Sequence, residues 1–395
     1  MSIVIGAGIT LGPGWSVTSS NPTNLWAWGG NLNGKLGLGD TVNRSSPVQV
    51  GALGTWSKVV TSRATTAAIK TDGTLWDWGG GESGRLGLGD TADRSSPVQV
   101  GALTTWAAVA VGNNNMAAIK TDGTLWTWGN AYYGQLANNT GGIGNYISRS
   151  SPVQIGALTT WSKISANNSS IAAIKTDGTL WTWGNNYAGA LGVGDKIKRS
   201  SPVQVGALTT WSNISGDTAG QNSQGSFIAT KTDGTLWAWG YNQTGQLGLG
   251  DTVKRSSPVQ VGTLTTWAVG KLGSNFGLGI KTAGSLWTWG YNNSGQLGSG
   301  IAGNLTYNSP VQVGTLTDWW SSWDKSTAGG KTGLAIKSDG TLWNWGYNAA
   351  GQLGRNNTAN TSSPVQLGSL TTWTSISAAG GAGGGDTGVL AIASH

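Results

Sequence analysis

Short runs in which apolar and polar residues alternate recur along the whole chain, and no stretch carries the 3.6-residue apolar period of a long amphipathic helix. One copy of the pattern holds four such runs, at residues 161–165, 171–175, 180–183 and 202–205. A Thr-Asp-Gly turn follows the second run, and Asp-Gly supplies the positive φ values of a tight hairpin. We therefore expect four short strands, named a to d in chain order, with a proline at the head of strand d.

The motif Leu-Trp-x-Trp-Gly, which forms strand c, marks a repeat. It starts at residues 25, 75, 125, 180, 236, 286 and 342, so successive copies lie 50 to 56 residues apart. A unit of this length cannot bury a core alone and must stack on its neighbours. Four strands per unit, with periodic Trp and Gly, predict an all-β fold: a seven-bladed β-propeller of four-stranded antiparallel blades.

The two ends of the chain predict how the ring closes. Counting from residue 25, the sequence holds seven complete sets of strands, and the last set ends with strands a and b at residues 373–376 and 389–392. We expect this C-terminal pair to join the first strands c and d, so that N- and C-terminal strands share one blade. Residues 1–24 are then an N-terminal arm or extra strand pair beside a propeller of residues 25–395. In the alternative, the C-terminal pair is displaced from the ring instead.

The repeat AIKTDGTLWTWG, followed by GQLGxGD and SPVQV, resembles that of the regulator of chromosome condensation family over essentially the whole chain. The resemblance implies a seven-bladed propeller, and the near-identical copies are similar to those of bacterial and bacteriophage members. It also implies guanine nucleotide exchange on a small GTPase and chromatin binding as candidate activities. Those activities would need an acidic contact loop, a protruding hairpin wedge and a basic N-terminal tail. Residues 1–20 contain no Lys or Arg, and no insertion forms a convincing wedge.

Composition narrows the chemistry. The chain has no Cys, and its one His is the C-terminal His395, so thiolate sites and the commonest catalytic base are missing. Carboxylates are spread around the ring without a paired arrangement, so we expect no enzyme, no catalytic residues and no cofactor. The net charge of +7 comes from single basic residues in successive repeats, which disfavours nucleic acid as a partner. No window is apolar enough to span a membrane and no signal peptide is evident, which predicts a soluble protein.

Of the 24 tryptophans, those that recur in all seven copies are interpreted as core, because a residue present in every copy of strand c is buried between packed blades. Plant ultraviolet-B photoreceptors resemble this family and use clustered Trp as chromophore, but their Gly-Trp-Arg-His-Thr signature is absent here. The Gly-rich loops are interpreted as turns; a calcium site at Asp40, Asp90, Asp195 or Asp251 is the alternative. The lysines before the b–c turns are expected to be solvated partners of those turns; they are Lys70, Lys120, Lys175, Lys231, Lys281 and Lys337.

Function is expected where the copies differ. Five apparent insertions, at residues 137–147, 216–226, 270–276, 320–333 and 380–387, are all assigned to the face that carries the a–b and c–d connections. Aromatic and amide side chains on such loops suit protein or glycan contact. The candidate binding residues are Tyr132, Tyr133, Tyr146, Asn222, Trp320 and Trp323.

The leading hypothesis is a non-catalytic binding or structural propeller, as a surface, decoration or host-attachment protein of a phage particle. Residues 1–20 would dock onto the larger assembly. One alternative is an intracellular protein–protein interaction module of the guanine-nucleotide-exchange type. The other is a glycan-binding lectin. Loop variation without functional consequence also remains open.

Overall fold

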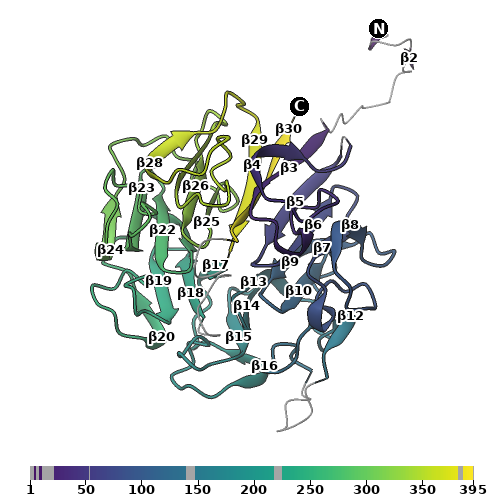
Figure 1. The fold of residues 1–395 in the computed structure, drawn as a ribbon. Coiled ribbons are helices and arrows are strands. Elements are labelled where there is room, and N and C mark those ends of the chain that lie inside the picture. The colour runs from purple at the N-terminus through teal and green to yellow at the C-terminus, as the bar shows by residue number, and fades with distance from the viewer. Residues whose placement is uncertain are drawn as a thin grey trace.

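Seven four-stranded antiparallel sheets surround a central axis in the computed structural model, and each sheet is one blade (Figure 1). The structure describes residues 22–52, 54–138, 147–217, 225–380 and 386–394, and the strand residues 4–5 and 9–10. The first strand of each blade contacts the first strands of its two neighbours, so these seven strands line the axis. The predicted seven-bladed propeller is therefore confirmed.

The blades are numbered in chain order, and in each the strands a to d run from the axis to the rim. Blade 1 consists of β5 (Trp56–Thr61), β6 (Thr65–Lys70), β7 (Leu75–Gly79) and β8 (Arg94–Gln99), and blade 2 of β9 (Trp106–Val111), β10 (Asn115–Lys120), β11 (Leu125–Gly129) and β12 (Arg149–Gln154). Blade 3 consists of β13 (Trp161–Ala166), β14 (Ser170–Lys175), β15 (Leu180–Gly184) and β16 (Arg199–Gln204), and blade 4 of β17 (Trp211–Gly216), β18 (Ser226–Lys231), β19 (Leu236–Gly240) and β20 (Arg255–Gln260). Blade 5 consists of β21 (Trp267–Leu272), β22 (Phe276–Lys281), β23 (Leu286–Tyr291) and β24 (Thr306–Gln312), and blade 6 of β25 (Ser326–Ala328), β26 (Thr332–Ile336), β27 (Leu342–Gly346) and β28 (Thr361–Gln366). Blade 7 consists of β29 (Trp373–Ala379), β30 (Gly388–Ser394), β3 (Thr23–Gly29) and β4 (Arg44–Gln49). Two single-turn 3₁₀ helices, η1 (Leu32–Gly34) and η2 (Glu82–Gly84), interrupt c–d connections.

Blade 7 joins the two ends of the chain, as predicted. Its strand order is β29-β30-β3-β4, and Trp26 on β3 pairs with Ala391 on β30. Near the N-terminus, β1 (Val4–Ile5) pairs with β2 (Ile9–Thr10) as a separate two-stranded sheet. Residues 1–3, 6–8 and 11–21 of the expected N-terminal arm lie outside the described part. Thr23 and Asn24 are the first residues of β3, and the division at residue 24 stays a prediction.

The b–c turns are held by the Asp-Gly-Thr sequence itself. In blade 2, one carboxylate oxygen of Asp122 accepts hydrogen bonds from the Thr124 N–H (2.9 Å) and the Thr124 hydroxyl (2.7 Å). That hydroxyl accepts in turn from the indole N–H of Trp126 (2.9 Å), while Gly123 takes a φ of 77° that suits glycine. The turn therefore also orients the first Trp of strand c.

Strand d begins earlier than the sequence pattern predicts. Proline does not head it: in blade 3, β16 starts at Arg199 and Pro202 is its fourth residue. The register between β15 and β16 shifts at this point, where Thr182 pairs with Val203 but Gly184 pairs with Arg199. Because β16 is the outermost strand and bulges here, proline's missing N–H costs no ladder bond.

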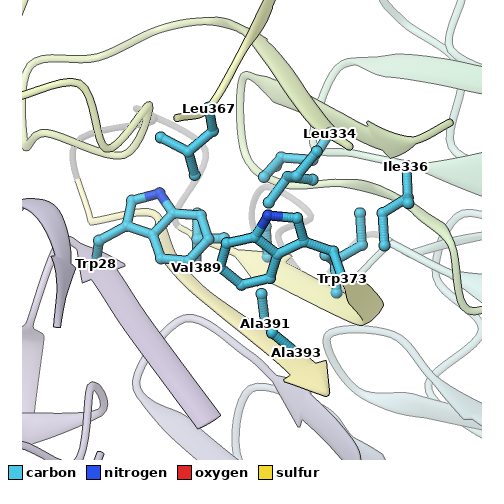
Figure 2. Close-up of a cluster of buried hydrophobic side chains, with 11 residues drawn as sticks. Trp28, Leu334, Ile336, Leu367, Trp373, Val389, Ala391 and Ala393 are labelled. Atoms are coloured by element: carbon cyan, nitrogen blue, oxygen red, sulfur yellow. The ribbon is translucent and has the colours of Figure 1, made fainter. Parts of the chain in front are cut away.

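The tryptophans form the contacts between blades. The second Trp of strand c is fully buried in all seven blades, and the Trp that opens strand a packs edge-on against it. Figure 2 shows this for Trp28 and Trp373, whose ring centroids lie 6.1 Å apart. Side chains from blade 6, including Leu334 and Leu367, and from blade 7, including Val389, surround the two indoles. The interpretation of these tryptophans as core is confirmed.

Each fully buried indole also donates a hydrogen bond to the preceding blade. The donors and the residues whose main-chain carbonyls accept are Trp28 and Gln352, Trp78 and Lys35, Trp128 and Arg85, Trp183 and Gln135, Trp239 and Ala190, Trp289 and Gln246, and Trp345 and Gln296. The c–d loop must approach the indole closely for this bond. At Gly87, for example, a Cβ atom would lie 2.8 Å from Nε1 of Trp128, which explains the glycine after Leu in the loop motif.

Candidate functional site

The strand order gives the disc two different faces. The a–b and c–d connections leave one end of every blade, and this is called the loop face; the b–c and d–a connections form the turn face. The turn face repeats the Thr-Asp-Gly and Gly-x-Leu-Thr sequences with little variation. The loop face differs from blade to blade, so it is the first place to look for a binding surface.

Tyrosines gather on the loop face. In five consecutive blades, 2 to 6, at least one tyrosine lies within four residues after the glycine of Leu-Trp-x-Trp-Gly; they are Tyr132, Tyr133, Tyr187, Tyr241, Tyr291 and Tyr347. Tyr132 and Tyr187 are 51% and 68% exposed, while Tyr241 is buried. The sequence analysis identified Tyr132 and Tyr133 as candidate binding residues. It missed the other four tyrosines, which are Tyr187, Tyr241, Tyr291 and Tyr347. Their shared position just after Leu-Trp-x-Trp-Gly was the signal that could have found them.

Neighbouring blades share contacts within this set. The rings of Tyr132 and Tyr133 meet edge to face with centroids 4.8 Å apart. The Lys254 amine lies 5.9 Å from the ring centroid of Tyr187 in blade 3 and 5.2 Å from that of Tyr241 in blade 4. Burial raises the pKa of the Tyr241 hydroxyl, which donates a hydrogen bond to the side-chain oxygen of Gln243. Tyr146 and Asn222, predicted as binding residues, lie outside the described residues.

Trp320 and Trp323 do not lie on the loop face. Ile336 on β26 accepts a hydrogen bond from the Trp320 N–H (3.0 Å) and donates its own N–H to the Lys325 carbonyl (2.8 Å). Residues 321–324 therefore bulge out of strand a between these two bonds. The bulge lies toward the turn face, because Trp319 pairs with Lys337, the residue before the b–c turn. The assignment of residues 320–333 to one a–b loop was wrong, since strand a resumes at Ser326 after the bulge.

The assignment of residues 270–276 as an insertion was also wrong. Strand β21 ends at Leu272 and β22 begins at Phe276, which is the same interval as between Thr61 and Thr65 in blade 1. What departs from the repeat in blade 5 is residue identity, and Lys271 on the inner strand is the clearest departure.

A cavity of about 320 Å³ lies along the axis and is lined by the inner strands. One edge of each inner strand has no partner within its blade, so residues that bulge from this edge enter the channel. Trp323 and Asp324 line the cavity in this way, together with Lys271 of the preceding blade. Trp320 is not part of the lining; its ring lies 4.6 Å from the Lys325 amine and is 38% exposed. The structure thus places Tyr132 and Tyr133 on the loop face and Trp323 in the channel, while Trp320 belongs to neither.

The lysines before the b–c turns are not merely solvated partners of those turns. Each amine lies over the first indole of strand c, 3.6 to 4.2 Å from the ring centroid. Lys120, for example, is 9% exposed and pairs across the sheet with Trp106. The register places the lysine stem against two indoles, and a desolvated cation over an indole is worth more than an exposed ion pair. The earlier interpretation is therefore corrected.

The acidic residues of the Gly-rich loops act in turns. One oxygen of Asp195 accepts from the Ile197 N–H (2.9 Å) and the Asn186 amide (3.0 Å), and the other accepts from Arg199 (2.6 Å). The hydrogen bond from the Ile197 N–H, followed by Arg199, holds the pKa of Asp195 below its usual range. Among the described residues, no three His, Cys, Asp or Glu side chains come together as metal ligands. The hydrogen bonds of Asp195 are those of the predicted turn.

Comparison with known proteins places this geometry in a family. The family model of the RCC1-like domain matches residues 4–325, and that of the regulator of chromosome condensation (RCC1) repeat matches residues 339–383. The ultraviolet-B receptor UVR8 of Arabidopsis thaliana is 29% identical over 205 residues, which are 52% of this chain and 45% of the receptor. The matched segment thus spans less than half of that relative.

Two solved structures agree in fold over nearly the whole chain. Human WBSCR16 superimposes with a TM-score of 0.79 at 18% identity, covering 94% of this chain and 99% of that one. Prp20p of Saccharomyces cerevisiae has a TM-score of 0.78 at 17% identity, covering 95% and 92%. None of the helices in the described part of the chain is long and apolar enough to cross a membrane. With its matching repeats, inter-blade indoles and ring closure, this chain belongs to the RCC1-like domain family.

Proposed function

We propose that this chain is a non-catalytic binding propeller that recognises a protein partner through the tyrosines of its loop face. The observation that carries the proposal is their arrangement: tyrosines lie at or shortly after the end of strand c in five consecutive blades and so form an arc over one face of the disc. Tyr132 and Tyr187 are the most exposed members of the arc.

Tyrosine suits this task physically. Its ring supplies a large apolar contact, its hydroxyl donates or accepts a hydrogen bond, and few side-chain torsions must be fixed on binding. The loops around the arc are rich in Asn, Ser and Gly and poor in charge. Such loops resemble the protein-binding surfaces in which tyrosines supply most of the contact area and small polar residues adapt to the partner.

Relatives of the same fold support a protein as the partner. Yeast Prp20p has been examined for binding to Gsp1p and histones, and a second structure holds yeast RCC1 (Prp20) bound to Kap60. These partners are properties of the yeast protein. For the present chain they favour the broad class of protein binding, and nucleotide exchange on a GTPase remains an alternative within that class.

Site-specific photocrosslinking tests the proposal. A benzophenone amino acid at position 187 on the loop face is compared with one at position 208 on the turn face, where Leu208 is 49% exposed. The expected result is a crosslinked partner protein from position 187, competed by unlabelled propeller, and none from position 208. The double variant Tyr132→Ala and Tyr187→Ala should weaken binding of that partner about tenfold or more.

Other outcomes would redirect the proposal. Crosslinks from position 208 alone, or binding that the tyrosine substitutions leave unchanged, contradict a loop-face site. Capture of a small GTPase together with accelerated nucleotide release would support the exchange-factor alternative. Discrete glycan hits that vanish with Trp323→Ala, and no protein partner, would support a lectin.

For the biological setting we propose the surface of a phage particle, in decoration or host attachment. The near-identical repeats and the low charged fraction of 10% support this setting. Mass spectrometry of purified particles should then detect the chain in stoichiometric amounts relative to other surface proteins. Its absence from particles, with abundance in the cell extract, would count against the setting while leaving the loop-face proposal intact.

A further inference from the structure

Lys271 breaks the pattern of the inner strands. It is the fifth residue of strand a in blade 5, and the other six blades carry an uncharged and mostly small residue there; these are Val60, Ala110, Ser165, Ser215, Thr327 and Ser377. One blade has thus placed a cation at a level of the channel that the others leave uncharged. The charged side chains among the described residues that line the cavity are Lys58, Lys271 and Asp324.

Other lysines on the inner strands have structural partners. Lys58 and Lys163 donate to the main-chain carbonyls of Ala107 and Ser212 in the next blade, at 2.5 Å in both cases. Lys325 donates likewise to the Thr374 carbonyl. These three side chains bridge adjacent blades, so their positions are explained by the fold.

Lys271 has no such bond to any residue in the described part of the chain. Its amine lies 4.2 Å from the ring centroid of Trp323, which the bulge of blade 6 brings into the channel. Burial lowers the pKa of Lys271 to about 7, partly offset by the carboxylate of Asp324. A donor held in a cavity beside an indole, without an acceptor, is poised to meet one from a ligand.

Two hydroxyls at the same level of the channel are also donors. Ser165 accepts a hydrogen bond from the Gly216 N–H (2.9 Å), and Ser377 accepts one from the Thr61 N–H (3.0 Å). Both hydroxyl oxygens already accept from the backbone, and neither hydroxyl hydrogen has an acceptor among the described residues. Each hydroxyl can therefore donate its hydrogen to a ligand.

We propose that the channel binds a small carboxylate- or phosphate-bearing molecule. The Lys271 amine pairs with the anionic group, the hydroxyls of Ser165 and Ser377 donate to further acceptor atoms, and the ring of Trp323 packs against the rest of the ligand. The cavity of about 320 Å³ lies within the range of small-molecule sites. This site is separate from the tyrosine arc and does not depend on the proposed protein partner.

The test is competitive acetylation of the intact protein with trace acetic anhydride, followed by peptide mass spectrometry. Because only the neutral amine reacts, the acetylation rate of each lysine reports its neutral fraction. Benzoate and inorganic phosphate are the two probes, and exposed Lys196 is the internal control. An anion that raises the pKa of the Lys271 amine by about one unit lowers its neutral fraction at pH 7 about fivefold. We expect at least that slowing at Lys271 with one or both probes and no change at Lys196.

The benzoate and phosphate measurements distinguish the two ligand classes. Protection by benzoate, reduced by Trp323→Leu, assigns a carboxylate with an apolar body; protection by phosphate alone assigns a phosphate. Calorimetry with the protecting anion should show binding that is lost in Lys271→Met and kept in Lys196→Met, with circular dichroism confirming the fold of each variant. Failure of both anions to protect Lys271, or equal protection of Lys196, overturns the proposal.

Discussion

The indole N–H of Trp28 donates a hydrogen bond to the main-chain carbonyl of Gln352 at 3.0 Å, across 324 residues of sequence. The equivalent hydrogen bond joins Trp183 of blade 3 to Gln135 of blade 2, which are consecutive in the chain, at 2.9 Å. The closing interface between blades 6 and 7 is therefore built from the same contact as the interfaces between consecutive blades.

Replacing these two indoles tests that equivalence. Trp28→Phe and Trp183→Phe each remove the donor, leave a buried carbonyl unpaired and shrink a fully buried ring. We expect each to lower the free energy of unfolding by about 2 to 4 kcal/mol, measured by urea denaturation. The two losses should agree within about 1 kcal/mol. A negligible loss for Trp28→Phe beside a large one for Trp183→Phe would show that the ring is open in solution.

Asp77 is predicted to destabilise blade 1 at neutral pH. It lies between Trp76 and Trp78 in the sequence of β7, and its side chain is fully buried. Neither carboxyl oxygen has a hydrogen-bond partner among the described residues, and burial raises its pKa well above the ordinary value. At this position Thr127 in blade 2 donates instead to the Leu136 carbonyl (2.8 Å). Asp77→Thr should therefore raise the free energy of unfolding at pH 7 by about 1 to 3 kcal/mol.

The pH dependence of this effect has a definite sign. A carboxyl ionises near pH 4 in the unfolded chain but only at higher pH in the folded one, so its ionisation favours unfolding as the pH rises above about 4. Wild-type stability should fall more steeply than that of Asp77→Thr over this range. The converse change Thr127→Asp should introduce the same slope into blade 2. Parallel stability curves for wild type and Asp77→Thr would contradict the assignment.

Blade 5 lacks the aspartate of the b–c turn and offers a gain-of-stability test. Ala283 occupies its place, while Ser285 still accepts from the Trp287 indole (3.0 Å). Ala283→Asp should restore the acceptor that Asp122 supplies to Thr124 in blade 2 and raise Tm by about 1–2 °C. Scanning calorimetry of the variant and of Ala283→Asn measures the gain.

Ala283→Asp and Ala283→Asn should differ in the stability that they add at low pH. Hydrogen bonds from Thr124 hold the pKa of Asp122 below its usual range. A carboxylate whose pKa is lowered by folding contributes stability above about pH 4 and loses it as the pH falls through the lowered value. The advantage of Ala283→Asp should therefore vanish at low pH, while that of Ala283→Asn persists. A gain from Ala283→Asp that is unchanged in acid would contradict the proposed hydrogen bonds.

Lys35 lies buried in the c–d connection of blade 7 and donates to the carbonyls of Arg63 and Asp386. Burial lowers its pKa to about 7. Four other blades carry Gln here; in blade 6, for example, the Gln352 side chain accepts from the Ala350 N–H (2.8 Å). Lys35→Gln should therefore be tolerated and should raise the free energy of unfolding at pH 6 by about 1 kcal/mol.

The lowered pKa of Lys35 also predicts how the free energy of unfolding changes with pH. Between about pH 7 and the unfolded value near 10.4 the unfolded chain binds more protons, so wild-type stability rises with pH. Lys35→Gln should remove this contribution, which urea denaturation at pH 6, 8 and 9.5 can measure. A variant whose stability rises as steeply as that of the wild type would show that Lys35 is not desolvated.

The repeat alone determined the fold. Thr-Asp-Gly specifies a tight hairpin through local hydrogen bonds and a positive φ, and the seven Leu-Trp-x-Trp-Gly motifs require inter-blade burial. Ring closure followed from counting, because residues 373–392 hold two strands whose blade lacks strands c and d until residues 25–50 supply them. The burial of the tryptophans could be foreseen on the same grounds.

Tertiary structure decided what the unusual residues do. An insertion in strand a can lengthen a loop or bulge from the strand, and only the pairing of Ile336 with Trp320 and Lys325 shows that residues 321–324 bulge. This bulge places Trp323 and Asp324 in the lining of the channel. Whether an inner-strand lysine finds a carbonyl depends on the neighbouring blade, which the sequence places about 50 residues away. For this reason the sequence alone does not show that Lys58 reaches a carbonyl of the next blade while Lys271 lies beside Trp323.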